Sequence, residues 1–158
     1  LHELRHSFPT RRSSDLELRG ALARQQLSLQ AGDVVLIRTG RMKVYDDAAA
    51  YMHNPPGLGM DAARFLVEEG GAMVVGADNL SFEAFPSEVA HNYVPVHTYL
   101  LAEQGTPILE LVYLEGLSEA GVHEFAFIGG GLRLRGADAA PMRPIALPLA
   151  PQSAADPR

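Results

Sequence analysis

Residues 56–78, PGLGMDAARFLVEEGGAMVVGAD, combine the signals of a short helix with those of a buried strand. Asp61 is a typical N-cap residue, the apolar residues after it recur on one helix face, and Gly70 and Gly71 end the pattern. The run AMVVGAD that follows is short, apolar and β-branched, as in strands buried on both faces. The stretch predicts a helix over 61–69 and a strand over 72–78.

The segment before it predicts a second strand. In DVVLIRTG, residues 33–40, the four apolar residues 34–37 are bounded by turn residues. A strand, a helix and a strand in this order favour a parallel βαβ unit, and therefore an α/β fold. Further upstream, residues 17–28 predict a short amphipathic helix.

After the βαβ pattern, VHTYLLAEQG (96–105) predicts a helix and PILELVYL (107–114) a strand. HEFAFIG (123–129) predicts another strand. The last apolar run, PIALPLA (144–150), carries prolines and therefore suits the edge of a sheet.

Composition limits the classes of function. The chain has 158 residues, a net charge of -6 and no cysteine. An acidic balance argues against nucleic acid as the main partner, and no apolar run approaches the roughly 20 residues that span a bilayer. Without cysteine there is no disulfide, thiolate metal site or cysteine nucleophile. We expect a cytoplasmic protein without a membrane partner.

Residues 1–16 differ from the rest of the chain in having no helix or strand period. SFPTRRSSDL, residues 7–16, matches without a mismatch the translation of a common sequencing-library adapter. We therefore expect residues 1–16 not to be native, and the native protein to continue upstream.

Two residues form the strongest candidate site. On the predicted helix, His97 shares a face with Leu100 and Leu101. On the predicted strand, Glu110 has apolar neighbours on both faces, so it is expected in a region of low dielectric constant. A buried carboxylate requires a partner, and a histidine on the preceding helix can supply one.

The pair has two interpretations. His97 and Glu110 form a normal ligand set for zinc or manganese, although two ligands alone do not hold a catalytic metal. Alternatively, they form a hydrogen-bonded pair in the core of a non-catalytic α/β module.

Three further residues are candidates for a supporting or substrate-contacting role. Asp78 and Ser81 follow the strand over 72–78, where α/β sheets place functional loops. His91 lies in the next loop and is a candidate for contacting one of the site residues or the substrate.

A different enzyme class is suggested by GLGMDA, residues 57–62. It fits the dinucleotide-binding pattern G-x-G-x-x-G/A at the start of a helix, with Asp78 downstream. The motif needs a strand directly before its first glycine, whereas the predicted strand ends near Gly40. A nucleotide-binding oxidoreductase is therefore the alternative function.

Four stretches resemble one family: GDVVLIRTG (32–40), PGLGMDAARFLVEEGGAMVVGAD (56–78), VHTYLLAEQGTPILE (96–110) and LRLRGADAAPMRPIALP (132–148). Together they are similar to the C-terminal part of the cyclase family, which includes bacterial kynurenine formamidases and related metal-dependent amide hydrolases. The resemblance covers residues 17–150, and we expect a disordered tail over 151–158.

This resemblance implies a swivelling β/β/α fold, here incomplete at the N-terminus, and a homo-oligomer. It implies zinc or manganese activating water to cleave the C–N bond of a small amide or lactam, as in arylformamidases of tryptophan catabolism. His97 and Glu110 match the two ligands of the C-terminal part. The other ligands belong to an N-terminal motif, HxGTHxDxP, which this chain lacks, so we expect the 158-residue chain alone to be inactive.

Two positions depart from the family pattern. Leu111 follows the candidate ligand Glu110 where family members often carry Asn, and Arg41 follows IRTG where an aromatic residue is common. The resemblance therefore implies an amide substrate without selecting one.

Overall fold

The structure, a computed structural model, describes residues 12–149, and these divide into two units, residues 12–116 and 117–149. The elements of the first unit are β1 (Arg12–Ser13), α1 (Asp15–Gln25), β2 (Val34–Ile37), η1 (Arg41–Val44), α2 (Ala48–Met52), β3 (Gly57–Leu58), α3 (Met60–Arg64), η2 (Phe65–Glu69), β4 (Val74–Ala77), α4 (Pro95–His97), η3 (Thr98–Glu103) and β5 (Ile108–Leu109). In the chain, α5 (Glu115–Glu119) leads from the first unit into the second.

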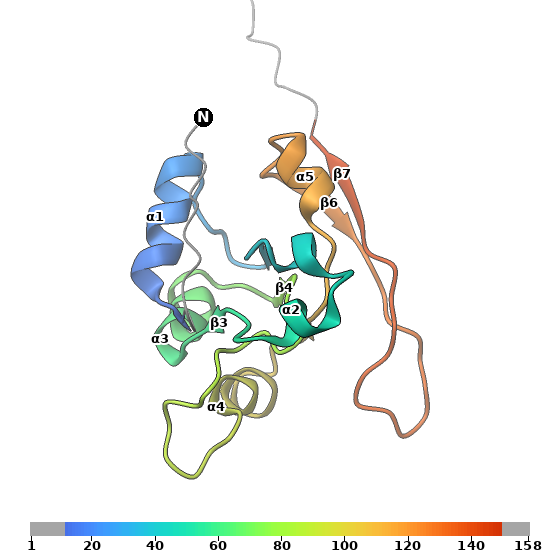
Figure 1. The fold of residues 1–158 in the computed structure, drawn as a ribbon. Coiled ribbons are helices and arrows are strands. Elements are labelled where there is room, and N and C mark those ends of the chain that lie inside the picture. The colour runs from blue at the N-terminus through green and yellow to red at the C-terminus, as the bar shows by residue number, and fades with distance from the viewer. Residues whose placement is uncertain (1–11, 150–158) are drawn as a thin grey trace, which may run out of the picture. The chain divides into compact units, whose positions relative to one another are not determined.

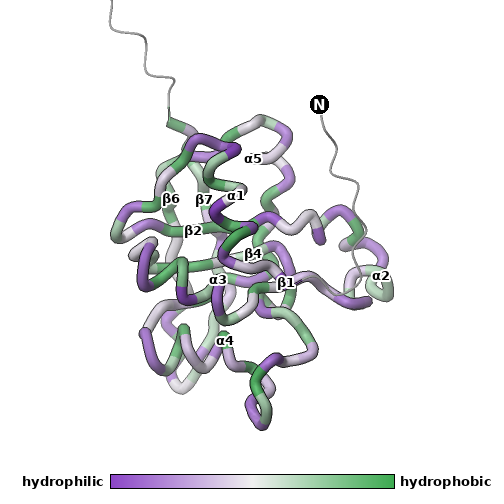
Figure 2. Tube along the Cα trace, turned by 90° about the vertical axis from the view of Figure 1, so that its left-hand side faces the viewer, coloured by the Kyte–Doolittle hydropathy of each residue, from purple (hydrophilic) through white to green (hydrophobic). Residues whose placement is uncertain are grey.

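A three-stranded parallel sheet in the order β2-β4-β5 lies at the centre of the first unit (Figure 1). Val34 pairs with Val74 and Ile37 with Ala77, in parallel register. Both strands are apolar along their whole length, and the tube in Figure 2 is green there. The predicted βαβ unit and α/β class are confirmed, because a helix over residues 60–69 joins two adjacent parallel strands.

The core forms where two helical segments pack on β4. The segments are residues 60–69 and 95–103, each an α-helical turn that widens into a π-helix. Pro95 begins the second segment, where its fixed φ and missing amide proton suit a first helical turn. The buried cluster comprises Leu58, Ala62, Ala63, Phe65, Leu66, Ala72, Val75, Ala77, Phe82, Val96, Tyr99 and Leu100.

The described part of residues 1–16 joins this fold. Arg12–Ser13 pairs with Gly57–Leu58, and Ser14 caps α1 in a capping box with Glu17. Residues 1–11 and 150–158, which include the expected tail, lie outside the described residues. The origin of residues 1–16 stays a prediction.

The strand predicted over 107–114 is wrong beyond Leu109. β5 contains Ile108–Leu109 alone, and Leu111 adopts a left-handed backbone with φ of 57°. A left-handed backbone raises the conformational free energy of a residue such as leucine by roughly 1–2 kcal/mol, whereas glycine and asparagine adopt it more readily. At Leu111 it ends the extended chain. Glu110 is therefore not enclosed between two apolar strand faces.

The GLGMDA segment has a structural explanation. Gly57 and Leu58 form β3, which pairs with β1 rather than with the three-stranded sheet. A Cβ atom on Gly57 would lie 2.2 Å from the carbonyl carbon and oxygen of Glu83. The glycine thus permits two backbones to touch, so a phosphate-binding role is not needed to explain it.

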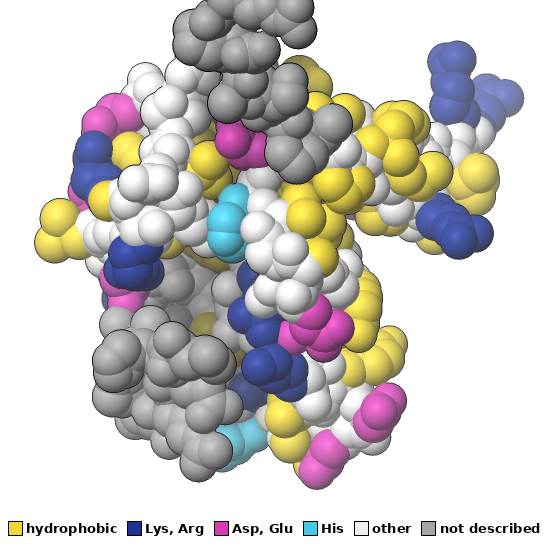
Figure 3. All heavy atoms as spheres, turned by 90° about the horizontal axis from the view of Figure 1, so that it is seen from above, with side chains coloured by type: hydrophobic (Ala, Val, Ile, Leu, Met, Phe, Trp, Pro, Cys, Tyr) yellow, Lys and Arg dark blue, Asp and Glu magenta, His cyan; other side chains and the backbone are white. Residues whose placement is uncertain are grey.

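The second unit contains an antiparallel hairpin of β6 (Phe125–Ile128) and β7 (Ile145–Pro148). Ala126 faces Leu147 and Ile128 faces Ile145, so these four share one face, and all four are exposed. In Figure 3 the hairpin, at the right of the view, shows hydrophobic side chains along its length and Lys or Arg side chains toward its end.

Among the helices of residues 12–149, none combines the length and apolar character needed to cross a bilayer.

We expect Gly57→Ala to lower the free energy of unfolding by about 2–3 kcal/mol, because the added methyl group has no room beside the Glu83 backbone. Chemical denaturation measures the change. Gly116→Ala is the matched control, since a Cβ atom there meets nothing within 4 Å. Equal stability of the two variants would contradict the close approach of β3 to Glu83.

Candidate functional site

The ends of β2 and β4 are joined by a buried carboxylate. Asp78 is fully buried, and its oxygens accept hydrogen bonds from Thr39 N at 2.9 Å, Thr39 Oγ1 at 2.5 Å, Gly40 N at 2.8 Å and Arg41 N at 3.1 Å. Four donors satisfy a carboxylate without any cation. Asp78, predicted to support a site, therefore holds the loop after β2 against the end of β4.

Arg41, one of the two departures from the family pattern, holds the next loop in place. Its guanidinium donates to the carbonyl oxygens of Tyr51 at 2.7 Å, of Ala50 at 2.5 Å and of His53. The Tyr51 hydroxyl in turn donates to the carbonyl oxygen of Asp78 at 2.9 Å. Burial, and then the charge of Asp78, raise the pKa of Tyr51, which keeps it a neutral donor.

A carboxylate that the sequence analysis missed, Glu83, organises the candidate site. Its side chain is 1% exposed and accepts from Val96 N at 3.3 Å and His97 N at 3.1 Å, at the N-terminus of α4. A helix N-terminus favours negative charge. Glu83 stands among apolar residues in FEAFP, the same signal that drew attention to Glu110.

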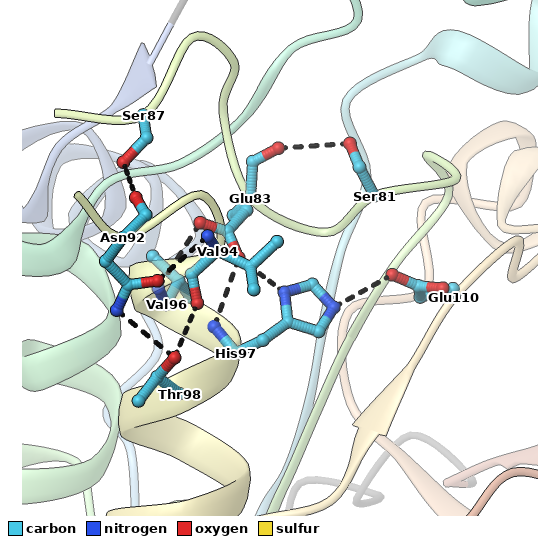
Figure 4. A network of polar contacts seen from close by, with 9 residues as sticks. All are labelled: Ser81, Glu83, Ser87, Asn92, Val94, Val96, His97, Thr98 and Glu110. Atoms are coloured by element: carbon cyan, nitrogen blue, oxygen red, sulfur yellow. Dashed lines mark hydrogen bonds and ion pairs between the residues drawn. The ribbon is translucent and has the colours of Figure 1, made fainter. Parts of the chain in front are cut away.

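His97 lies between two carboxylates (Figure 4). Nδ1 is 2.5 Å from Glu83 Oε1, and Nε2 is 3.3 Å from Glu110 Oε1. The imidazole is 25% exposed. The prediction that His97 shares a helix face with Leu100 and Leu101 is partly wrong, because Leu100 is fully buried whereas Leu101 is 50% exposed.

The predicted meeting of His97 with Glu110 occurs, but not in the expected environment. Glu110 retains 34% of its side-chain exposure, because the chain leaves the sheet directly after β5. The buried carboxylate beside His97 is Glu83, and Glu110 is the one that solvent reaches.

Of the other predicted residues, Ser81 belongs to this group and His91 does not. The Ser81 hydroxyl donates to the carbonyl oxygen of Glu83 at 3.0 Å, and its own carbonyl accepts from Glu83 N. His91 is exposed in its loop, and within residues 12–149 no hydrogen bond or ion pair connects it to His97.

The two negative neighbours change the acidity of His97. Interaction with Glu110, and then with Glu83, raises the pKa of the His97 imidazole from 6.5 to about 9, against burial, which lowers it. Without a metal, His97 is therefore protonated at neutral pH and forms ion pairs with both carboxylates.

A divalent metal fits two atoms of this arrangement. Two ligands of one tetrahedral zinc ion stand about 3.4 Å apart, given bond lengths near 2.1 Å, and His97 Nε2 and Glu110 Oε1 are 3.3 Å apart. Glu83 at Nδ1 is the kind of carboxylate that orients a ligating histidine. Within residues 12–149, however, no three His, Cys, Asp or Glu residues are grouped so as to hold a metal. Residues 12–149 can thus supply two of the four ligands of a tetrahedral zinc ion.

The Cyclase family model matches residues 6–84, half of the chain. A crystal structure described as that of a novel cyclase is 32% identical, with a TM-score of 0.75, over 86% of this chain and 46% of that one. No curated protein matches.

Two isatin hydrolases share the fold. Isatin hydrolase A from Ralstonia solanacearum is 20% identical, with a TM-score of 0.70, over 87% of this chain and 53% of that one. Isatin hydrolase A from Labrenzia aggregata, bound to benzyl benzoate, is 18% identical, with a TM-score of 0.62, over the same shares. The chain spans about half the length of each of these three structures.

The raised pKa predicts a pH-dependent stability of the metal-free protein. The pKa of His97 is higher in the folded than in the unfolded protein. The contribution of His97 to the free energy of unfolding is therefore complete below pH 6.5, declines between pH 6.5 and about 9, and is lost above that. We expect a loss of about 2 kcal/mol across this window, allowing for screening of the exposed Glu110. Urea unfolding at several pH values measures it. Glu110→Gln should flatten the dependence, and an unchanged slope in that variant would contradict the ion pair.

Proposed function

Because this chain belongs to the cyclase family, we propose that the protein is a metal-dependent hydrolase of an amide C–N bond, with His97 and Glu110 as two of the metal ligands. One observation carries the proposal. The imidazole is held at Nδ1 by a buried carboxylate, and its Nε2 is 3.3 Å from a second carboxylate that solvent reaches.

Each residue of the group has a definite role in this proposal. Glu83 accepts the Nδ1 proton, which fixes the tautomer and leaves the Nε2 lone pair for a metal. Glu110 supplies the second ligand and compensates positive charge. Ser81 holds the backbone of Glu83 through its hydroxyl and its carbonyl. A bound zinc or manganese ion would polarise the substrate carbonyl and activate water. Further ligands must come from outside residues 12–149.

The proposed substrate is a small amide or lactam. Two structures with this fold are named for the hydrolysis of isatin, which contains a cyclic amide. A formyl amide, as in the arylformamidase reaction on formylkynurenine, is the other proposed substrate. We further propose that the complete protein is a homo-oligomer without a nucleic-acid partner.

A non-catalytic role for the pair is the second candidate. The observation that favours it is that the cluster is satisfied without a metal, since a protonated His97 pairs with both carboxylates and two backbone amides also donate to Glu83. The two candidate functions differ in bound metal: the hydrolase requires a metal ion, and the non-catalytic ion pair does not.

We expect the complete protein to hold one zinc or manganese ion per protomer, measured by elemental mass spectrometry. Glu110→Gln should lower activity on the amide substrate more than about 100-fold and reduce the bound metal. His91→Ala is the control, as an exposed histidine unconnected to the site. Full metal content in Glu110→Gln would favour the non-catalytic role.

The substrate is chosen by turnover of the complete protein on formylkynurenine and on isatin, each followed by its absorbance. Turnover of either that is lost in both Glu110→Gln and His97→Ala, but kept in His91→Ala, would support the proposal. Turnover that survives both site variants would place the chemistry elsewhere.

A further inference from the structure

Left-handed backbone at residues other than glycine occurs at five positions of residues 12–149. Three have ordinary explanations: one caps α1, one is an asparagine and one lies in an exposed loop, namely Gln26, Asn54 and His91. The other two are bulky apolar residues, Phe82 with φ of 52° and Leu111 with φ of 57°.

These two residues adjoin the two carboxylates that contact His97. Phe82 directly precedes Glu83, and Leu111 directly follows Glu110. Strained backbone persists only where the surroundings enforce it, and it is concentrated at functional sites. The coincidence on both sides of one imidazole therefore requires a physical account.

At Leu111 the backbone is enforced by hydrogen bonds rather than by its side chain. Leu111 N donates to the carbonyl oxygen of Asn79 and Val112 N to that of Ala77, both at 3.1 Å. Successive amides of a regular strand point to opposite edges, whereas these two bind the same neighbouring segment, as at a bulge. Leu111 is 41% exposed, so core burial does not explain the conformation.

Glu110 lies directly before the bend. In a continued strand Glu110 would share a face with Ile108, which packs against the core. With the chain turned at Leu111, the Glu110 carboxylate instead lies 3.3 Å from His97 Nε2 and is partly exposed.

We propose that Leu111 is a positioning residue, whose left-handed backbone, and not its side chain, turns the Glu110 carboxylate toward His97. The proposal deepens the proposed function and rests on it for any consequence in catalysis.

The Glu83 side of the imidazole is built in the same way. Glu83 N donates to the carbonyl oxygen of Ser81, which encloses Phe82 in a three-residue γ-turn, and the Ser81 hydroxyl donates to the Glu83 carbonyl oxygen at 3.0 Å. Phe82 is fully buried and its carbonyl oxygen accepts from Leu58 N at 2.9 Å. Since Phe82 is also a core residue, Leu111 is the position where backbone and side chain can be tested separately.

Three substitutions separate the two roles of Leu111. Leu111→Gly and Leu111→Asn accept a positive φ, whereas Leu111→Val does not, because its β-branched side chain clashes there. The readout is the ¹⁵N chemical shift of His97 Nε2 in the metal-free 158-residue chain at neutral pH. Glu110→Gln defines the shift expected when the carboxylate no longer faces the ring. The thermal midpoint is measured on the same samples.

We expect Leu111→Gly and Leu111→Asn to keep the wild-type Nε2 shift, and Leu111→Asn to raise the thermal midpoint. Leu111→Val should move the Nε2 shift to that of Glu110→Gln while the Nδ1 shift, which reports Glu83, is retained. A wild-type Nε2 shift in folded Leu111→Val would overturn the proposal. An Nε2 shift equal to that of Glu110→Gln in Leu111→Gly or Leu111→Asn would also overturn the proposal. If Leu111→Val does not fold, these two variants decide whether the backbone or the side chain of Leu111 positions Glu110.

Zinc affinity of the complete protein, measured by competition with a chelator, is a separate readout. We expect it to fall about 10–100-fold in Leu111→Val and to be kept in Leu111→Asn. If the wild-type protein binds neither zinc nor manganese, the proposed function fails while the Nε2 shifts still decide the role of Leu111.

Discussion

A carboxylate that is 1% exposed must be compensated by its surroundings, and the compensation of Glu83 joins the parts of the first unit. Two amides at the start of α4 and one imidazole nitrogen supply it. The loop that carries Glu83 is in turn held by Leu58 and by the close approach of Gly57. Uncompensated burial of such a charge costs several kcal/mol, so helix start, loop and histidine depend on one another.

Those parts of the fold that follow from hydrophobic periodicity could be predicted from the sequence. β2, β4 and the helix over 60–69 lie within a few residues of their predicted bounds, because each buries a regular apolar pattern. The environment of Glu110 could not be predicted in this way. Apolar alternation continues through Val112 and Leu114, but backbone hydrogen bonds to Asn79 and Ala77 turn the chain. Tertiary hydrogen bonds of this kind leave no periodic signal.

Within the candidate site, sequence reasoning identified His97 and Glu110 as neighbours but not the arrangement around them. His97 and Glu110 were paired because a lone buried carboxylate needs a partner, and the pair exists in a more exposed setting. Glu83 was missed because its loop has neither helical nor strand period, although the same argument applies to it. The structure also bears on Leu111, which stands where family members often carry asparagine. Asparagine tolerates left-handed backbone better than leucine does, and the structure has that backbone at this position.

The hairpin of β6 and β7 has a consequence for how the chain behaves in solution. Neither strand carries a charged residue, and one face consists of four exposed apolar side chains. Exposed apolar faces without charged residues favour aggregation, which the net charge of -6 opposes through repulsion between molecules. Added salt screens that repulsion, so the colloidal stability of this chain should fall as the ionic strength rises. Its solubility limit is set by a segment remote in sequence from His97.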